Sequence, residues 1–100
     1  MTIEEMAAEF ERLADLPSGG PDFDPKTARH PVRDIAALLL LNELDSTPHF
    51  AAISAAEHDE IFFAYDAFKV AECITLEEIA ELDRCGVYFD AELDCFKKFV

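Results

Sequence analysis

The residues that come nearest to a metal site begin at Asp22. Asp22-Phe23-Asp24 opens like a calcium-binding loop. However, Thr27 occupies the sixth position, where the loop needs glycine, and Arg33 occupies the twelfth, where it needs glutamate. The chain also lacks the Cys-x-x-Cys and His-Glu-x-x-His spacings that hold zinc. We therefore expect no metal site and no cofactor.

Nucleophilic catalysis needs a serine or cysteine beside a base, and no such setting is recognisable here. The chain contains no Gly-x-Ser-x-Gly motif, and His58-Asp59-Glu60 is typical of a polar turn. Cys73, Cys85 and Cys95 are an odd number of cysteines in a chain without a secretory signal, which indicates reduced thiols in a cytosol. We expect no catalytic residue. A small enzyme or metal protein that uses His49, His58 and the cysteines is the weakest of three hypotheses.

The segment from Thr75 to Val87 resembles the first helix and turn of a helix-turn-helix domain. A DNA-reading protein then presents Arg, Lys, Asn or Gln from the second helix. Here the following segment carries Asp90, Glu92 and Asp94 instead. Because clustered bases are needed to neutralise phosphates, we expect no direct binding of nucleic acid.

Apolar residues recur at three- and four-residue spacing along most of the chain, which indicates helices. The pairs Thr2/Glu5 and Thr75/Glu78 form capping-box patterns. The predicted helices span residues 2–16, 31–44, 47–57, 59–73, 75–85 and 89–100. A short strand near residues 60–65 is the alternative in the fourth segment. The sequence thus predicts one all-α domain, residues 1–100, of four to six helices. The run Ile35–Leu41 is apolar nearly all round, which favours a central helix packed on several sides over an interface.

The charge is the most unusual property of the sequence. Twenty-two acidic residues stand against eight basic ones, a formal net charge of −14 spread over both halves. Like-charged pairs four residues apart oppose helix formation and exceed what solubility needs. Anionic membranes and nucleic acids are poor partners, whereas a basic protein surface is complementary. We predict that such a surface is contacted by Glu77, Glu78, Glu81, Asp83, Asp90, Glu92 and Asp94, with Glu5 and Glu9 of the first helix.

In size, acidity and lack of a catalytic motif, the chain resembles the small phage-type anti-CRISPR proteins. The resemblance covers the whole chain as a profile and implies an inhibitor that binds a CRISPR surveillance complex and stops it engaging target DNA. With no secretory signal after Met1, the expected location is the cytoplasm, that of the host cell if a phage encodes the protein.

Two other interpretations compete with the inhibitor. The acidic residues serve only solubility in both of them. In the first, the chain is simply a solvated domain. In the second, it is an adaptor or immunity-type module that docks through an apolar surface containing Phe62, Phe63 or Tyr88.

Overall fold

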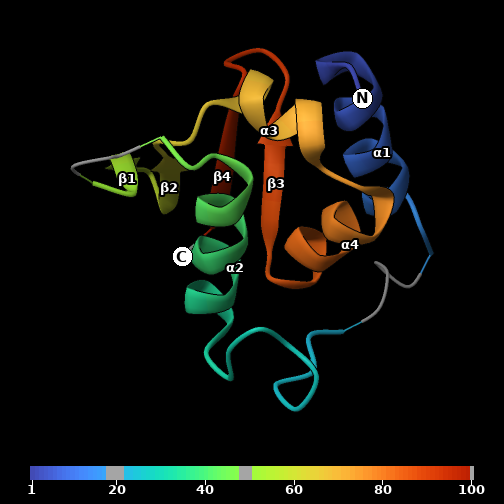
Figure 1. The fold of residues 1–100 in the computed structure, drawn as a ribbon, viewed down its shortest axis with the longest axis vertical. Helices are drawn as coiled ribbons and strands as arrows, with labels where there is room; N and C mark the ends of the chain where they lie inside the picture. Colours follow the sequence, from blue (N-terminus) through green and yellow to red (C-terminus); the bar gives the residue numbers. More distant parts are fainter. Residues whose placement is uncertain (18–21, 48–50, 100) are drawn as a thin grey trace.

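The computed structural model describes residues 1–17, 22–47 and 51–99. Its helices are α1 (Ile3–Ala14), α2 (Arg33–Leu44), α3 (Ala67–Cys73) and α4 (Leu76–Arg84). Its strands are β1 (Ile53–Glu57), β2 (Glu60–Phe63), β3 (Val87–Asp90) and β4 (Cys95–Phe99). They form one antiparallel sheet with the order β1-β2-β4-β3 (Figure 1). The fold is therefore α+β, and the prediction of an all-α domain is wrong.

The two capping boxes expected from the sequence are present. The Glu5 backbone N–H donates to the Thr2 hydroxyl (3.1 Å), and the Glu5 carboxylate accepts from the Thr2 N–H (2.8 Å). Thr75 and Glu78 make the same exchange at the start of α4. Each box satisfies two backbone donors that a helix start leaves without partners. The helices expected over residues 2–16, 31–44 and 75–85 are confirmed, with ends that differ by one or two residues.

Residues 51–66 depart from the prediction of two helices. β1 and β2 form a hairpin whose turn contains His58 and Asp59, with φ of 51° and 65°. Two successive left-handed residues cannot lie inside a right-handed helix. The strand alternative for residues 60–65 is confirmed by β2, and α3 begins only at Ala67 after the N-cap Asp66. Pro48, the expected start of the helix over 47–57, lies outside the described residues.

The predicted closing helix is also wrong, because residues 87–99 form a second hairpin. Phe89 and Phe96, seven residues apart, would share a helix face; instead they pair across β3 and β4 with ring centroids 5.4 Å apart. Both rings pack with Phe10 of α1. Asp94, with φ of 49°, lies in the connecting turn. Two phenylalanines seven residues apart therefore fit either one face of a helix or opposite positions in a hairpin. Pairing of β4 with β2 favours the hairpin.

The hydrophobic core lies between the helices and one face of the sheet. Met6, Leu40 and Ile79 bring α1, α2 and α4 against Phe96 at the centre of the sheet. Lys98 shares this inner face, and its ammonium group donates to the Cys85 carbonyl oxygen (3.1 Å) and lies 3.2 Å from the Asp34 carboxylate. Within residues 1–17, 22–47 and 51–99, no helix has the length and apolar character needed to cross a membrane.

Candidate functional site

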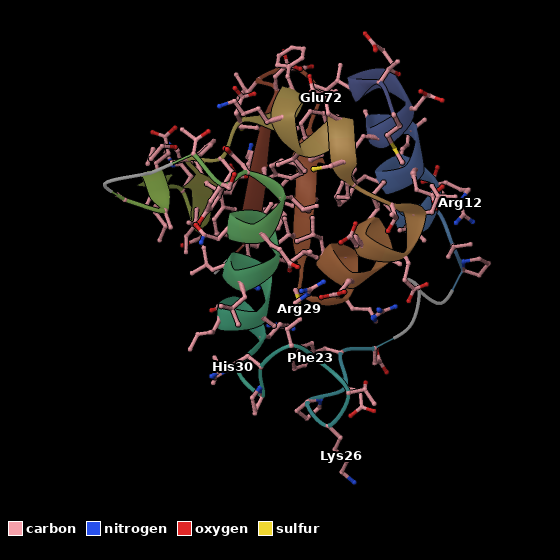
Figure 2. All side chains as sticks on the ribbon, in the orientation of Figure 1. Arg12, Phe23, Lys26, Arg29, His30 and Glu72 are labelled. Atoms are coloured by element: carbon pink, nitrogen blue, oxygen red, sulfur yellow. The ribbon has the colours of Figure 1, made fainter. Side chains whose placement is uncertain are left out.

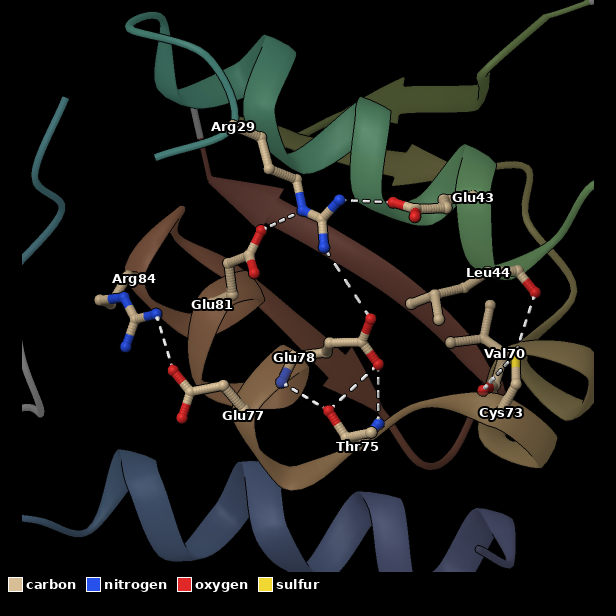
Figure 3. A network of polar contacts seen from close by, with 10 residues as sticks. All are labelled: Arg29, Glu43, Leu44, Val70, Cys73, Thr75, Glu77, Glu78, Glu81 and Arg84. Atoms are coloured by element: carbon tan, nitrogen blue, oxygen red, sulfur yellow. Dashed lines mark hydrogen bonds and ion pairs between the residues drawn. The ribbon is translucent and has the colours of Figure 1, made fainter. Parts of the chain in front are cut away.

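Arg29 lies in the loop before α2 (Figure 2), and three acidic side chains surround it (Figure 3). Its guanidinium group binds the carboxylates of Glu43 on α2 and Glu81 on α4, and lies 3.9 Å from that of Glu78. These contacts fasten the loop to two helices. Three carboxylates around one guanidinium still leave the cluster with a formal charge of −2.

The four predicted contact residues of α4 do not form one open acidic patch. Glu78 and Glu81 are occupied by the helix cap and by Arg29. Glu77 is exposed, and its carboxylate lies 3.8 Å from the Arg84 guanidinium. Asp83 is half-buried, and this desolvation raises the pKa of its carboxyl group. Of the four, Glu77 has the most exposed side chain, at 84%.

The predicted residues of the second hairpin are divided between two roles. Asp90 accepts N–H groups from Glu92 and Leu93 in the turn, and it also binds the Lys97 ammonium group at 2.9 Å. Glu92 and Asp94 are exposed in the β3–β4 turn. The structure thus leaves these two carboxylates accessible to a partner while Asp90 stabilises the hairpin.

On α1 the two predicted residues have local roles. Glu5 caps the helix, and Glu9 forms a bidentate pair with Arg12 with both N–O distances at 2.7 Å. Glu4, Glu11 and Asp15 are exposed, as is Glu5, and because the first three are seven and four residues apart they share one stripe. We call these three residues the α1 acidic stripe.

Many basic side chains form ion pairs within the described part of the protein. Among residues 1–17, 22–47 and 51–99, five basic side chains lie within ion-pair distance of a described carboxylate. These are Arg12, Arg29, Arg84, Lys97 and Lys98. Both of the last two are also buried. The accessible surface is therefore dominated by acid to a greater degree than the composition indicates.

Lys97 organises the sheet face opposite the helices. Its ammonium group lies 3.1 Å from the Glu60 carboxylate and 4.8 Å and 5.7 Å from the ring centroids of Phe62 and Tyr88. The Tyr88 hydroxyl donates to Glu60 at 2.8 Å. Phe62 and Tyr88, both partly buried, thus pack beside this ammonium group, and Phe63 is buried on the inner face.

A cavity of about 370 Å³ lies between residues 22–29, α2 and α4. Arg29, Arg84, Glu77 and Glu81 contribute to its wall together with Cys85. Cys85 is buried, and desolvation raises the pKa of its thiol. A protonated buried thiol is a poor nucleophile.

The described residues contain no group of three or more His, Cys, Asp and Glu side chains arranged to hold a metal ion. His58 lies in the β1–β2 turn, and His49 falls outside the described residues. The free thiols lie on different elements: Cys73 is exposed, Cys85 is buried and Cys95 is half-buried.

Helix α2 exposes an apolar stripe that sequence reasoning missed. Val32, Ile35 and Leu39, which we call the α2 stripe, are 50%, 40% and 48% exposed. On the opposite side Ala36, Ala37, Leu40 and Leu41 are buried. The expectation of a helix packed on several sides is thus only half correct. The continuous apolar run of Ile35–Leu41 could have indicated an exposed apolar surface, but it did not show which side of the helix would remain exposed to solvent.

Comparison of the chain with protein-family models, curated proteins and solved structures found no significant match.

Proposed function

We propose that this protein is a non-enzymatic inhibitor that binds the basic, nucleic-acid-holding surface of a protein complex. The observation that carries the proposal is the internal use of the bases, which leaves a surface dominated by carboxylates. Such a surface attracts a positively charged channel over several ångströms and speeds the encounter. The CRISPR surveillance complex is the proposed target, in keeping with the resemblance to phage-type anti-CRISPR proteins.

The α1 acidic stripe is the best contact surface that the structure offers. At a rise of 1.5 Å per residue, Glu4 and Glu11 lie about 10 Å apart along the axis and Glu11 and Asp15 about 6 Å apart. Carboxylates held on a helix lose less freedom on binding than those on a loop. The carboxylates of the stripe are more widely spaced than the phosphates of a DNA duplex. Charge alone would therefore compete weakly with DNA, and the protein would also block the site sterically.

A DNA-binding assay tests the proposal. Purified CRISPR surveillance complexes are titrated with the protein at about 50 and 200 mM salt, and target-DNA binding is measured. We expect loss of DNA binding at low salt and relief at high salt. If no complex loses DNA binding at either salt concentration, the proposed target is wrong.

Two variants of equal net charge locate the contact. The first carries Glu4→Gln, Glu11→Gln and Asp15→Asn. The control carries Asp22→Asn, Glu57→Gln and Asp59→Asn, which are exposed acids elsewhere. Both raise the net charge by three, from −14 to −11. We expect inhibition on the order of tenfold weaker for the first variant and near wild type for the control. Equal losses would mean that overall charge acts without a defined contact.

The adaptor hypothesis keeps one specific observation in its favour, the exposed α2 stripe. The aromatic residues that the sequence suggests for docking make contacts within the fold instead. Phe62 and Tyr88 pack beside the Lys97 ammonium group, and Phe63 is buried. A pure adaptor would bind its partner equally well at low and high salt, so the salt titration separates it from the inhibitor.

A further inference from the structure

The α2 stripe is an apolar surface on a protein whose exposed surface is otherwise rich in acid. Ile35 and Leu39 are four residues apart, so their side chains follow one another along the helix, and Val32 is the N-cap residue directly before it. All three are 40–50% exposed, although the inward side of the same helix is fully packed. A helix that is apolar all round is normally covered on every side. The described chain covers only one side of α2.

Glu43 borders the stripe on its carboxyl-terminal side, one turn after Leu39. Its side chain is 63% exposed and belongs to the cluster of Glu43, Glu78 and Glu81 around Arg29. Glu43 is the most exposed of these three carboxylates, and because the cluster keeps a formal charge of −2, its open side at Glu43 attracts cations. An apolar strip next to a net negative cluster is complementary to a segment with apolar residues on one side and bases on the other.

A second copy of this chain fits the stripe poorly. Two copies, each with a net charge of −14, repel one another. A stable dimer also buries about 800 Å² per subunit, far more than three half-exposed aliphatic side chains provide. The surface suits a narrow element that supplies opposite charge.

We propose that the α2 stripe docks an amphipathic, basic helix of the partner, with apolar side chains against Val32, Ile35 and Leu39 and Lys or Arg side chains beside Glu43. This inference rests on the proposed function in one respect, namely that the partner is basic. Burial of aliphatic surface supplies affinity that salt does not weaken, while the charges set the orientation. The arrangement corresponds to the recognition of an amphipathic helix through apolar residues spaced three and four apart.

A pair of synthetic peptides tests the docking. One has leucines at i, i+3, i+4, i+7 and i+11 with lysines between them, and the other has the same composition in scrambled order. Both are titrated into the protein while the methyl NMR signals are recorded. We expect the patterned peptide to bind at least about tenfold more tightly and to shift the signals of Val32, Ile35 and Leu39. Equal binding of the two peptides, or no binding of either, overturns the proposal.

Matched double variants give a second, independent readout. Ile35→Gln with Leu39→Gln should abolish the preference for the patterned peptide. The control, Leu76→Gln with Leu93→Gln, changes two leucines that are 60% and 61% exposed on other elements and should retain the preference. If both pairs behave alike, the stripe is not the docking site. Sedimentation that shows a wild-type dimer lost in the Ile35/Leu39 variant would identify a second copy as the occupant and overturn the proposal.

The same variants separate this inference from the proposed function. If the Ile35/Leu39 variant still blocks DNA binding by the surveillance complex with full affinity, the inhibitor proposal stands and the stripe is rejected. If the wild-type protein never blocks DNA binding but prefers the patterned peptide, the proposed target is rejected and the docking surface stands.

Discussion

The Lys97 ammonium group lies 2.9 Å from the Asp90 carboxylate on the neighbouring strand, on the sheet face opposite the packed helices. Glu60 approaches the same ammonium from β2 on the other side. One cation therefore joins β2, β3 and β4 across the outer face. Two of the residues in this arrangement are acids and one is a base, so the arrangement is sensitive to loss of the base.

Replacement of Lys97 by Met should lower the thermal midpoint by several degrees at pH 7. Methionine keeps an aliphatic chain against Phe62 and Tyr88 but leaves Glu60 and Asp90 facing each other without a cation. Thermal unfolding followed by circular dichroism measures the change. Lys26→Met, at an exposed loop position, is the control and should be close to neutral. Equal midpoints for the two variants would show that the Lys97 cluster contributes nothing to stability.

The same cluster should make the protein sensitive to acid. The hydrogen bond from Lys97 lowers the pKa of Asp90, and hydrogen bonds from Tyr88 and Lys97 lower the pKa of Glu60. A lowered folded-state pKa contributes stability above the unfolded value of about 4, and this contribution disappears as the pH falls through the folded-state pKa. Urea unfolding at pH 7 and pH 3 should show a smaller loss in Lys97→Met than in wild type. Parallel losses would contradict the assignment.

Asp83→Asn should stabilise the protein at pH 7. Burial raises the pKa of the Asp83 carboxyl group, because the ionised form is disfavoured in the folded state. The protonated carboxyl group stabilises the fold at low pH, and this stability is lost as the pH rises through the raised pKa. The gain should vanish below about pH 3, where wild-type Asp83 is protonated. Glu92→Gln removes the same charge at an exposed position and serves as the control for general repulsion. A gain of equal size in both variants would assign the effect to net charge.

Gly86→Ala should destabilise the protein by about 1–3 kcal/mol. Gly86 has φ of 82°, and an added Cβ would lie 2.9 Å from the Lys98 ammonium nitrogen. That nitrogen is held by the Cys85 carbonyl and Asp34, so it cannot move aside without breaking buried contacts. Urea unfolding measures the loss, and an unchanged midpoint would show that the α4–β3 turn tolerates a side chain.

The three thiols should react with a disulfide reagent in the order Cys73, Cys95, Cys85. Cys73 is exposed, Cys95 is half-buried and Cys85 is buried. Desolvation also raises the pKa of the Cys95 and Cys85 thiols, which lowers their thiolate fraction at pH 7.5. Stopped-flow labelling with single Cys→Ser variants as controls assigns each phase. Rapid labelling of Cys85 in the folded protein would contradict its burial.

The sequence by itself determined where α1 and α4 begin and how acidic the protein is. Thr2 with Glu5 and Thr75 with Glu78 start two helices through contacts three residues apart, which no distant residue needs to supply. The acidic character follows from composition alone. What the composition could not show is that Arg29 would cross to Glu81, 52 residues away, and remove predicted contact acids from the surface.

Only the tertiary structure decided the sheet. Phe89 and Phe96 have a spacing that fits a helix. Lys97 and Lys98 are both polar and adjacent, so they do not show the alternation of apolar and polar residues that predicts a strand. In the fold these lysines point to opposite faces, where Asp90 and Glu60 hold one and Asp34 and the Cys85 carbonyl hold the other. Each contact joins residues that pairing of β2, β3 and β4 first brings together. Because strand pairing and burial of charge depend on distant partners, local periodicity predicted a helix where the folded protein forms a strand.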